Sequence, residues 1–429
     1  MGPNRDQTSP ETGLRDTLPA KSLWQREIGT GYSAPSVRSG LLVLHHRFGG
    51  EEIVEAMDAA SGKARWRHAY PSAFTDPFGY NNGPRSSPLL TTERCYTFGA
   101  EGVLLCLDLA TGKPLWRRDT NKDFDVPEAF FGVGSSPILE DGKIIVLLGG
   151  QPNSGVVAFD AKTGATIWQN VGEKTWNGVP MTGWPGARTV QWNSSDPAFQ
   201  KQASYCTPVA ATIHGKRHIL CCTRQGLVSL DPSDGSANFS FWFRVRQDSS
   251  VNAMTPVIDG DSILLSTAYF RGGSVLLRVQ PDGRSVAEGW RGSQLEIHWT
   301  RPVLTGGHLF AFSGRDEPDA RFRCVEWTTG ALKWDRNEGW PNGGHGKVAP
   351  GSEPKVFGRG SAILADGKLI ALGEAGLLGI FRPNAERVEE LARWQVPGLS
   401  YPCWAAPVLA EKRVYLRSED LLVCLDFAQ

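Results

Sequence analysis

The sequence predicts an all-β protein, a single eight-bladed β-propeller of four-stranded antiparallel blades. Three observations predict this fold. A turn unit recurs along the chain, a proline-containing segment recurs about twenty residues before each turn unit, and the last unit lacks a strand that the N-terminus can supply. A unit that repeats at a steady interval is the signature of a repeat architecture. Closure of such units into a ring removes the exposed edges of the sheets.

The turn unit is an acidic residue with a glycine four positions later and a large aromatic residue eight positions later. Its copies are Asp58/Gly62/Trp66, Asp108/Gly112/Trp116, Asp160/Gly164/Trp168, Asp231/Gly235/Phe239 and Glu326/Gly330/Trp334. The alternating apolar run before the acid has the period of a strand. An aspartate can bond its own backbone in a tight turn, and glycine supplies a positive φ. We therefore expect these acids to form turns rather than to act in catalysis, and the aromatic rings to fill the gaps between neighbouring sheets.

The proline-containing segment predicts the first strand of each blade. Small residues precede the proline and a short aliphatic run follows it, at Pro35, Pro88, Pro137, Pro208, Pro256, Pro302 and Pro407. A further apolar run lies between this segment and the turn unit, often after Asp-Gly as in Asp141-Gly142, which is a hairpin signal. Each unit thus predicts four strands, A to D, with the proline at the start of A and the aromatic residue on D.

Two units are degenerate and one is split. The degenerate units centre on Gln280 with Trp290 and on Arg382 with Trp394. The last unit begins at Pro407 and reaches Asp426 without a D strand. We expect Leu23-Trp24-Gln25 to supply it, so that an N-terminal strand joins the C-terminal blade and closes the ring. Residues 1–20 are polar and lack the blade pattern, and we expect a loosely ordered leader ahead of a propeller at 21–429.

Composition and cysteine spacing exclude several classes of protein. The formal net charge is zero and no long apolar run occurs, so we expect no nucleic-acid partner and no membrane span. We also expect a monomer. The cysteines lack metal-ligand spacing, and no metal site is expected. Cys106, Cys324 and Cys424 each lie two residues before an acidic turn position, where small buried side chains are expected. Cys221 and Cys222 could form a strained ring disulfide, but neighbours on a strand point to opposite faces, which favours two separate thiols.

The turn unit as it occurs in CLDLATGKPLW, ending at Trp116, and AFDAKTGATIW, ending at Trp168, resembles the repeat of the PQQ-like β-propellers. That superfamily includes quinoprotein alcohol dehydrogenases and BamB-type outer-membrane assembly lipoproteins. The segment GPNRDQTSPETGL, from Gly2 to Leu14, resembles a family of PQQ-like repeat proteins abundant in Planctomycetes and Verrucomicrobia. The resemblance implies a periplasmic or otherwise exported protein, and we expect this chain to be its mature part, without the signal peptide.

The resemblance also implies a possible cofactor. In quinoprotein dehydrogenases PQQ lies in the channel over a tryptophan, under a disulfide between adjacent cysteines and beside a Ca²⁺ ion. Here Cys221 and Cys222 fall in the B-strand run HILCCT rather than in a mouth loop, and no matching set of Glu, Asn and Asp is found. We therefore expect no cofactor. PQQ with Ca²⁺ is kept as the alternative.

Functional residues are expected where the repeat pattern is broken at one mouth of the channel. The D-to-A and B-to-C connections emerge on that face, and four D-to-A connections are long: 69–85, 119–134, 172–204 and 336–360. They carry Phe78, Tyr80, Phe130, Phe131, Trp176, Trp184, Trp192, Trp340 and His345. Such rings suit stacking on sugars or capture of a peptide, although they also suit packing of the loops onto the rim.

Large residues and arginines mark the entrance of the channel. The B-to-C connections carry Arg47, Arg224, Arg271, Arg315 and Arg417, and Arg301 replaces the small residue that precedes the proline in other blades. A ring of guanidinium groups suits carboxylate, sulfate or an acidic glycan, unless neighbouring acids pair with them. The candidate ligand-binding residues are His46, Arg47, Arg85, Tyr205, Arg224, Asn252, Tyr269, His298, Trp299, Arg301 and Arg315.

Two classes of function follow. The first is an exported binding or scaffold protein whose mouth holds a polysaccharide, a peptide or an envelope protein. The second is an enzyme with its site in the same mouth, either a PQQ-dependent dehydrogenase of alcohols or sugars or a carbohydrate-active enzyme. We favour the first, because no catalytic triad, metal triad or nucleotide motif appears and no catalytic residue can be assigned.

Overall fold

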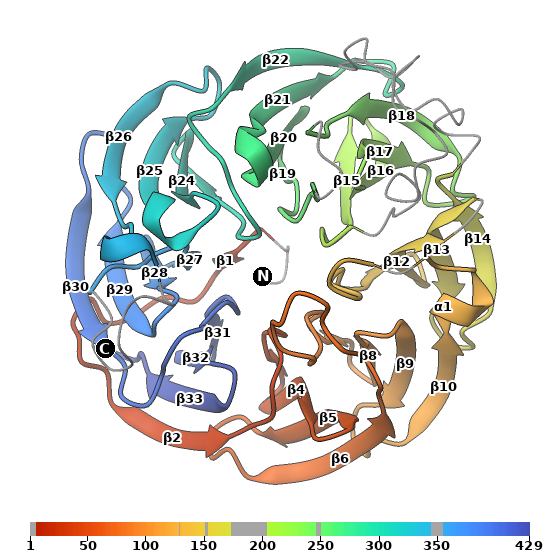
Figure 1. Ribbon diagram of the computed structural model, residues 1–429, viewed down its shortest axis with the longest axis horizontal. Helices are drawn as coiled ribbons and strands as arrows, with labels where there is room; N and C mark the ends of the chain where they lie inside the picture. The colour runs from red at the N-terminus through yellow and green to blue at the C-terminus, as the bar shows by residue number, and fades with distance from the viewer. Residues whose placement is uncertain (1–5, 128, 151–152, 173–203, 246–249, 345–354) are drawn as a thin grey trace.

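The computed structural model describes residues 6–127, 129–150, 153–172, 204–245, 250–344 and 355–429. Eight sheets are arranged around a central axis, with strand A of each unit toward the axis and strand D outermost (Figure 1). The four strands A to D of a unit are antiparallel to their neighbours, as the repeat predicts. The sequence prediction of an eight-bladed β-propeller is confirmed.

The first four blades follow one another along the chain. They are β3 (Ser36–Arg38), β4 (Leu41–Phe48), β5 (Glu51–Asp58) and β6 (Ala64–Pro71); β7 (Leu89–Leu90), β8 (Arg94–Phe98), β9 (Val103–Asp108) and β10 (Pro114–Asp119); β11 (Ile138–Glu140), β12 (Lys143–Gly150), β13 (Ser154–Asp160) and β14 (Thr166–Asn170); and β15 (Val209–Ile213), β16 (Lys216–Cys222), β17 (Gly226–Leu230) and β18 (Ala237–Trp242).

The remaining blades continue the pattern. They are β19 (Val257–Asp259), β20 (Ser262–Thr267), β21 (Gly273–Val279) and β22 (Val286–Gly292); β23 (Val303–Thr305), β24 (His308–Ser313), β25 (Arg321–Glu326) and β26 (Leu332–Asn337); β27 (Ser361–Ala365), β28 (Lys368–Leu372), β29 (Leu377–Arg382) and β30 (Glu389–Gln395); and β31 (Val408–Ala410), β32 (Arg413–Arg417), β33 (Leu421–Asp426) and β2 (Ser22–Glu27). Short helices in the connections are α1 (Thr120–Asp123), η1 (Tyr269–Arg271), η2 (Glu317–Asp319) and η3 (Pro341–Gly343).

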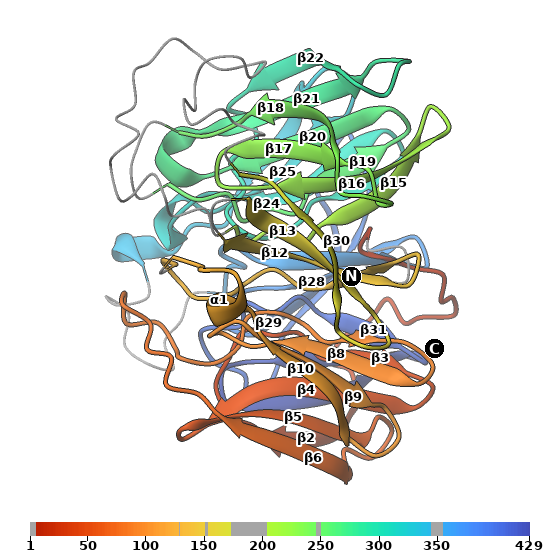
Figure 2. The same cartoon turned by 90° about the vertical axis from the view of Figure 1, so that its right-hand side faces the viewer.

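The eighth blade contains both ends of the propeller sequence. Strand β2 pairs antiparallel with β33, and Trp24 lies opposite Cys424. The N-terminal strand therefore supplies the missing D strand, as predicted, and the ring has no open end. Figure 2 shows the first two long connections, the second with α1, on one face, while the C-terminus lies toward the other.

The N-terminal segment differs from the sequence prediction of a loosely ordered leader. Strand β1 (Thr8–Ser9) pairs in parallel with β27 and becomes the innermost strand of the seventh blade. Leu14 is fully buried, and its backbone N–H donates to the Asp366 carboxylate over 2.9 Å. The segment is held by these backbone hydrogen bonds and by Leu14, Leu18 and Ala20, which pack in the hydrophobic core between the last two blades without forming the blade pattern.

The turn unit has the structural role that the sequence predicts. The Asp58 carboxylate accepts hydrogen bonds from the backbone N–H and the hydroxyl of Ser61, over 3.0 and 2.8 Å, and Gly62 has φ +69°. The aromatic residue lies in the seam between blades. There, six tryptophans donate their indole N–H to a carbonyl of the following blade: Trp24, Trp66, Trp116, Trp168, Trp290 and Trp334.

Hydroxyl groups link the A strands around the channel. In the first four blades the residue before the proline donates its backbone N–H to the hydroxyl at the same position in the next blade, in the order Ala34 to Ser87, Ser87 to Ser136, Ser136 to Thr207 and Thr207 to Thr255. In the sixth blade Arg301 occupies this position and donates its Nε–H to Pro256 O over 3.3 Å. Ser87, Ser136, Thr207 and Thr255 thus form a row of hydroxyl groups around the channel, which we call the hydroxyl belt.

The core is divided among the seams between blades. Cys106, Cys324 and Cys424 are fully buried in three of these seams, which confirms their prediction as small filling side chains. Cys221 packs in the seam between the third and fourth blades, and Cys222 packs in the next seam. The two thiols are free, because adjacent side chains on β16 point into different seams.

Candidate functional site

Aromatic rings from distant parts of the chain meet at the face that carries the long connections. Trp404 lies at the centre, with ring centroids 4.8 Å from Tyr32, 5.6 Å from Tyr80, 5.1 Å from Trp299 and 5.8 Å from Tyr401. These residues precede or connect the first, second, sixth and eighth blades, so their rings span the mouth of the channel. We call these five residues the mouth cluster.

Further rings extend the mouth cluster outward on one side. Phe131 contacts Tyr80, Phe78 and Tyr205, with centroid distances of 6.0, 5.1 and 5.4 Å. Phe78 and Tyr80 are 55% and 49% exposed, although both are large and their neighbours are aromatic. An exposed group of rings of this kind is typical of an interaction surface.

A buried ion network supports the mouth cluster from below. The Arg359 guanidinium donates to the Glu374 carboxylate over 2.7 and 3.0 Å and to the Glu317 carboxylate over 2.6 Å. It also lies 4.7 Å from the ring centroid of Trp299. Burial lowers the pKa of Arg359, but the Glu374 and Glu317 carboxylates outweigh it and hold that pKa above its usual range. Arg359 therefore remains charged, and its guanidinium is satisfied by partners within the protein.

The same carboxylates fix two rings of the mouth cluster. Trp404 donates its indole N–H to Glu374 over 2.7 Å, and Tyr401 donates its hydroxyl to Glu317 over 2.8 Å. Burial and the charge of Glu374 raise the pKa of Tyr401. The rings are thus held in place rather than free to rotate, which reduces the entropy that a ligand would have to overcome.

Sequence reasoning missed Arg359 and Glu374. A signal was present, because the seventh blade has Gly-Glu-Ala-Gly, with Glu374, in the B-to-C connection where five other blades have arginine. Its partner lies in the segment Gly358-Arg359-Gly360, directly before the A strand. This exchange of an arginine for an acid distinguishes the seventh blade from the others.

His298 contacts the edge of this network. Its Nδ1 lies 3.0 Å from Arg315 O, and its ring lies 4.7 Å from Trp299 and 5.0 Å from Tyr269, centroid to centroid. Burial and the positive charge of Arg359 lower the pKa of His298 to about 3. The imidazole is therefore neutral near pH 7 and cannot serve there as a cationic ligand for an anion.

Two of the predicted arginines hold the first long connection. Arg47 donates to the carbonyl oxygens of Phe74, Asn82 and Ser72 over 2.6 to 3.0 Å. Arg85 forms an ion pair with the buried Asp76. Their guanidinium groups stabilise the loop instead of facing a ligand.

The predicted residues of the fourth blade also connect loops. Arg224 is 1% exposed, donates its Nε–H to Ser250 O over 2.9 Å and lies 4.9 Å from the Phe130 ring. Asn252 donates to the carbonyl oxygens of Thr223 and Phe243 over 3.0 and 2.8 Å. The Tyr205 hydroxyl accepts from the Phe131 backbone N–H over 2.9 Å.

His46 and Arg301 lie away from the mouth cluster. His46 is 6% exposed and its Nδ1 accepts the backbone N–H of Gly29 over 2.7 Å, which leaves it in the seam of the first and eighth blades. Burial lowers the pKa of His46, and burial lowers that of Arg301 to about 10. Arg301 occupies the position that follows Thr255 in the hydroxyl belt and donates to Pro256 O of the fifth blade instead. Arg417 donates to four carbonyl oxygens, those of Gly29, Ser33, Ser418 and Glu419.

These contacts correct the expectation of an open ring of guanidinium groups. Among the B-to-C arginines, Arg47, Arg224 and Arg417 bind backbone carbonyls, whereas Arg271 and Arg315 bind no acceptor within the part of the chain that the structure describes. Of the aromatic residues predicted on the long connections, Trp176, Trp184, Trp192 and His345 lie outside the described residues.

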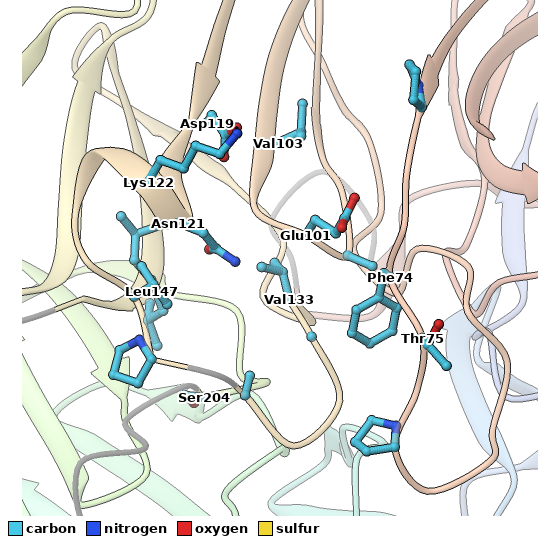
Figure 3. Close-up of a pocket in the computed structure, with 18 of the residues that line it drawn as sticks. Phe74, Thr75, Glu101, Val103, Asp119, Asn121, Lys122, Val133, Leu147 and Ser204 are labelled. Atoms are coloured by element: carbon cyan, nitrogen blue, oxygen red, sulfur yellow. The ribbon is translucent and has the colours of Figure 1, made fainter. Parts of the chain in front are cut away.

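A pocket of about 480 Å³ lies between the first two long connections (Figure 3). Phe74 and Thr75 line one side, and Asn121 and Lys122 line the other. Three of its four charged side chains have hydrogen-bond or ion-pair partners: Lys122 Nζ lies 3.0 Å from the Asp119 carboxylate, and Glu101 accepts the backbone N–H of Ala73 over 3.0 Å. The fourth, Arg117, lies 5.4 Å from the ring centroid of Tyr70. No chemistry is therefore assigned to it.

The residues do not fit the quinone site that the resemblance implies. The adjacent cysteines that would cover the quinone point into separate seams. Within the described ranges, no group of three or more His, Cys, Asp and Glu side chains could hold a metal ion. Trp299 and Trp404 lie in the mouth, where Tyr32, Tyr80 and Tyr401 contact Trp404 with tilted or edge-on rings.

The fold and the repeat define a PQQ-like β-propeller. The family model described as "Outer membrane protein assembly factor BamB" matches residues 50–336. The chain belongs to this family. No curated protein matches it in sequence. None of the helices in the described segments is long and apolar enough to cross a membrane.

Solved structures show the same fold at low identity. BamB from Moraxella catarrhalis is 13% identical with a TM-score of 0.58, covering 96% of this chain and 98% of that one. Quinohemoprotein alcohol dehydrogenase from Comamonas testosteroni is 12% identical with a TM-score of 0.64, covering 98% of this chain and 78% of that one. A europium-containing methanol dehydrogenase is 12% identical with a TM-score of 0.66, covering 96% and 87%. These likenesses concern the fold alone.

Proposed function

We propose that this chain is an exported binding or scaffold propeller that holds a partner on its loop-rich face and acts without bound PQQ. The observation that carries the proposal is the mouth cluster with the exposed rings of Phe78 and Tyr80 beside it. Interface energy concentrates in aromatic side chains that are held rigidly before binding.

The partner is a polysaccharide, a peptide or an envelope protein. The family description, which names an outer membrane assembly factor, supports a protein partner and an exported location. The charge distribution agrees, because Arg47, Arg85 and Arg359 have internal partners and leave the mouth dominated by rings.

Photo-crosslinking in the producing bacterium tests the proposal. A photoreactive phenylalanine analogue at Tyr80 is expected to give a discrete crosslinked product. The same analogue at Leu139 provides the control, since Leu139 is 39% exposed at the A-to-B end of the third blade. The crosslink should disappear in a Phe78→Ser variant. Equal products from Tyr80 and Leu139, or none from Tyr80, would remove the support for this face.

The alternative is an enzyme that uses PQQ or acts on carbohydrate. The fold likeness to the dehydrogenases keeps it open. Purified protein incubated with PQQ and Ca²⁺ is expected to show neither a shift in quinone absorbance nor dye reduction with alcohols or sugars. Dye reduction above that of a heat-treated sample would replace the binding proposal with the quinoprotein one.

A further inference from the structure

A pocket lies at the rim of the loop-rich face, between the fifth and sixth blades. Its volume is about 390 Å³, and it is bounded by the β20–β21 connection, which contains η1, and the β24–β25 connection, which contains η2. Its lining includes Phe270, Arg271, Glu296, Ser313, Arg315 and Asp319. The volume is within the range of small-ligand sites.

Two guanidinium groups in this pocket are not used by the fold. Within the described residues, the side chains of Arg271 and Arg315 form no hydrogen bond or ion pair. Arg315 instead lies 4.8 Å from the ring centroid of Phe270 and 5.0 Å from that of Tyr269. A guanidinium whose face rests on rings keeps its N–H edge for an acceptor, and carboxylate or sulfate oxygens match that edge.

The backbone beside these groups is strained. Phe270 has φ 49° and ψ 38°, and Arg271 has φ 57°, so two consecutive residues with large side chains occupy the left-handed region. This region is unfavourable for residues other than glycine. The conformation leaves the Phe270 ring 39% exposed at the pocket, and strain of this kind is concentrated at ligand sites.

Carboxylates complete the lining and narrow the class of ligand. Glu296 has no ion-pair partner within 4 Å in the described residues, and burial raises its pKa. Asp316 and Asp319 are exposed at the same rim. These acids would repel an acidic peptide with its many carboxylates. They can accept hydrogen bonds from hydroxyl groups that lie around a single anionic group.

We propose that this pocket binds an acidic sugar residue of a polysaccharide. The carboxylate or sulfate of the sugar lies between Arg271 and Arg315, its ring lies against Phe270, and its hydroxyl groups donate to the carboxylates of Glu296 and Asp319. The inference rests on the proposed binding function, because the sugar would belong to the partner that the propeller holds. It concerns a different surface from Phe78 and Tyr80.

Calorimetric titration of the full chain with a short oligogalacturonate tests the site. The fully methyl-esterified oligomer has the same rings without the charge, and a sulfated oligosaccharide of similar length tests the second anion. We expect binding of the acidic oligomer, at least tenfold weaker binding of the ester, and a loss of about tenfold or more in Arg271→Ala and in Arg315→Ala. Arg38→Ala is the matched control, because Arg38 is exposed on β3 and has no acid partner in the described residues.

The aromatic part of the site is tested separately. Phe270→Ala is expected to weaken binding severalfold and Phe270→Tyr to restore it, with unchanged melting temperatures showing that the fold is intact. Equal binding of the acid and its ester, or no loss in the two arginine variants, would overturn the site. Competition by inorganic sulfate together with full binding in Phe270→Ala would overturn the sugar and leave an anion site. The crosslink at Tyr80 reports on the mouth and the two arginine variants report on this pocket, so failure here is distinguishable from failure at the mouth.

Discussion

The indole ring of Trp66 in the first blade lies against Gly112 in the turn of the second blade, and its Nε1 donates to Leu109 O over 2.9 Å. A Cβ atom at Gly112 would overlap that ring, and Gly112 also has φ +71°. The glycine is therefore required twice, once for the turn and once for the seam.

Gly112→Ala is expected to destabilise the protein by about 2–4 kcal/mol, the sum of overpacking and of a left-handed alanine. Gly142→Ala is the matched control, because Gly142 has φ +72° but nothing within 4 Å of a Cβ. It should cost only about 1–2 kcal/mol. Urea unfolding of both variants measures the difference, and equal losses would show that the seam contact contributes nothing.

The hydroxyl belt predicts that loss of one of its hydroxyl groups lowers the stability of the protein. Ser136→Ala removes the acceptor of the Ser87 N–H and should cost about 1–3 kcal/mol. Ser136→Thr keeps a hydroxyl at the same position, as Thr207 and Thr255 do in the next two blades, and should be close to wild type. Equal stability of the two variants in thermal unfolding would contradict the role of the hydroxyl.

The ion network of Arg359, Glu374 and Glu317 predicts that replacing one carboxylate by an amide lowers the free energy of unfolding substantially. Glu374→Gln removes a fully buried partner of Arg359 and should cost about 3 kcal/mol or more. Glu389→Gln breaks a solvent-screened pair with Arg382 and should leave stability close to that of the wild type. Unfolding midpoints of the two variants give the comparison, and similar midpoints would contradict a structural role for the network.

His298 predicts a dependence of stability on pH. Its pKa is about 3 in the folded protein, against a usual value of 6.5. Above pH 6.5 the imidazole is neutral in both states. As the pH falls below that value, the unfolded chain binds a proton that the folded protein does not bind, so stability falls by up to about 1.4 kcal/mol per pH unit. The slope between pH 6 and 4 should be smaller in His298→Gln, and an unchanged slope would exclude this histidine as a cause.

The positions of Cys221 and Cys222 predict how the two thiols react with a thiol reagent. Burial raises the pKa of the Cys221 thiol, and both side chains are in seams between blades. A thiol reagent should leave them unmodified in the folded protein and modify both after unfolding without reductant. Peptide mass spectrometry reads this directly, and a linked pair two hydrogens lighter would show a ring disulfide instead.

The repeat made the fold predictable because each unit specifies its own turn and its own seam. Trp24 was assignable to the last blade for that reason, before any contact was known. The site was less predictable, because the sequence shows which residues break the repeat but not which groups neutralise them. Arg85 and Arg301 break the repeat and are engaged by the fold, through Asp76 and Pro256. Arg359 and Glu374 lie 15 positions apart in the sequence, and only the fold of the seventh blade brings them into hydrogen-bond contact.

The joint between β2 and β33 has a consequence for how the molecule comes apart. In a linear array of repeats, an end unit can separate while the others stay folded. Here the first and last segments share one sheet, so no blade is terminal and every blade has two neighbours. Losing any one blade exposes two seams at once. Cleavage between β2 and β3 would leave the contacts of β2 in place, yet β2 would then be a separate strand, held in the eighth blade by non-covalent contacts alone and able to dissociate.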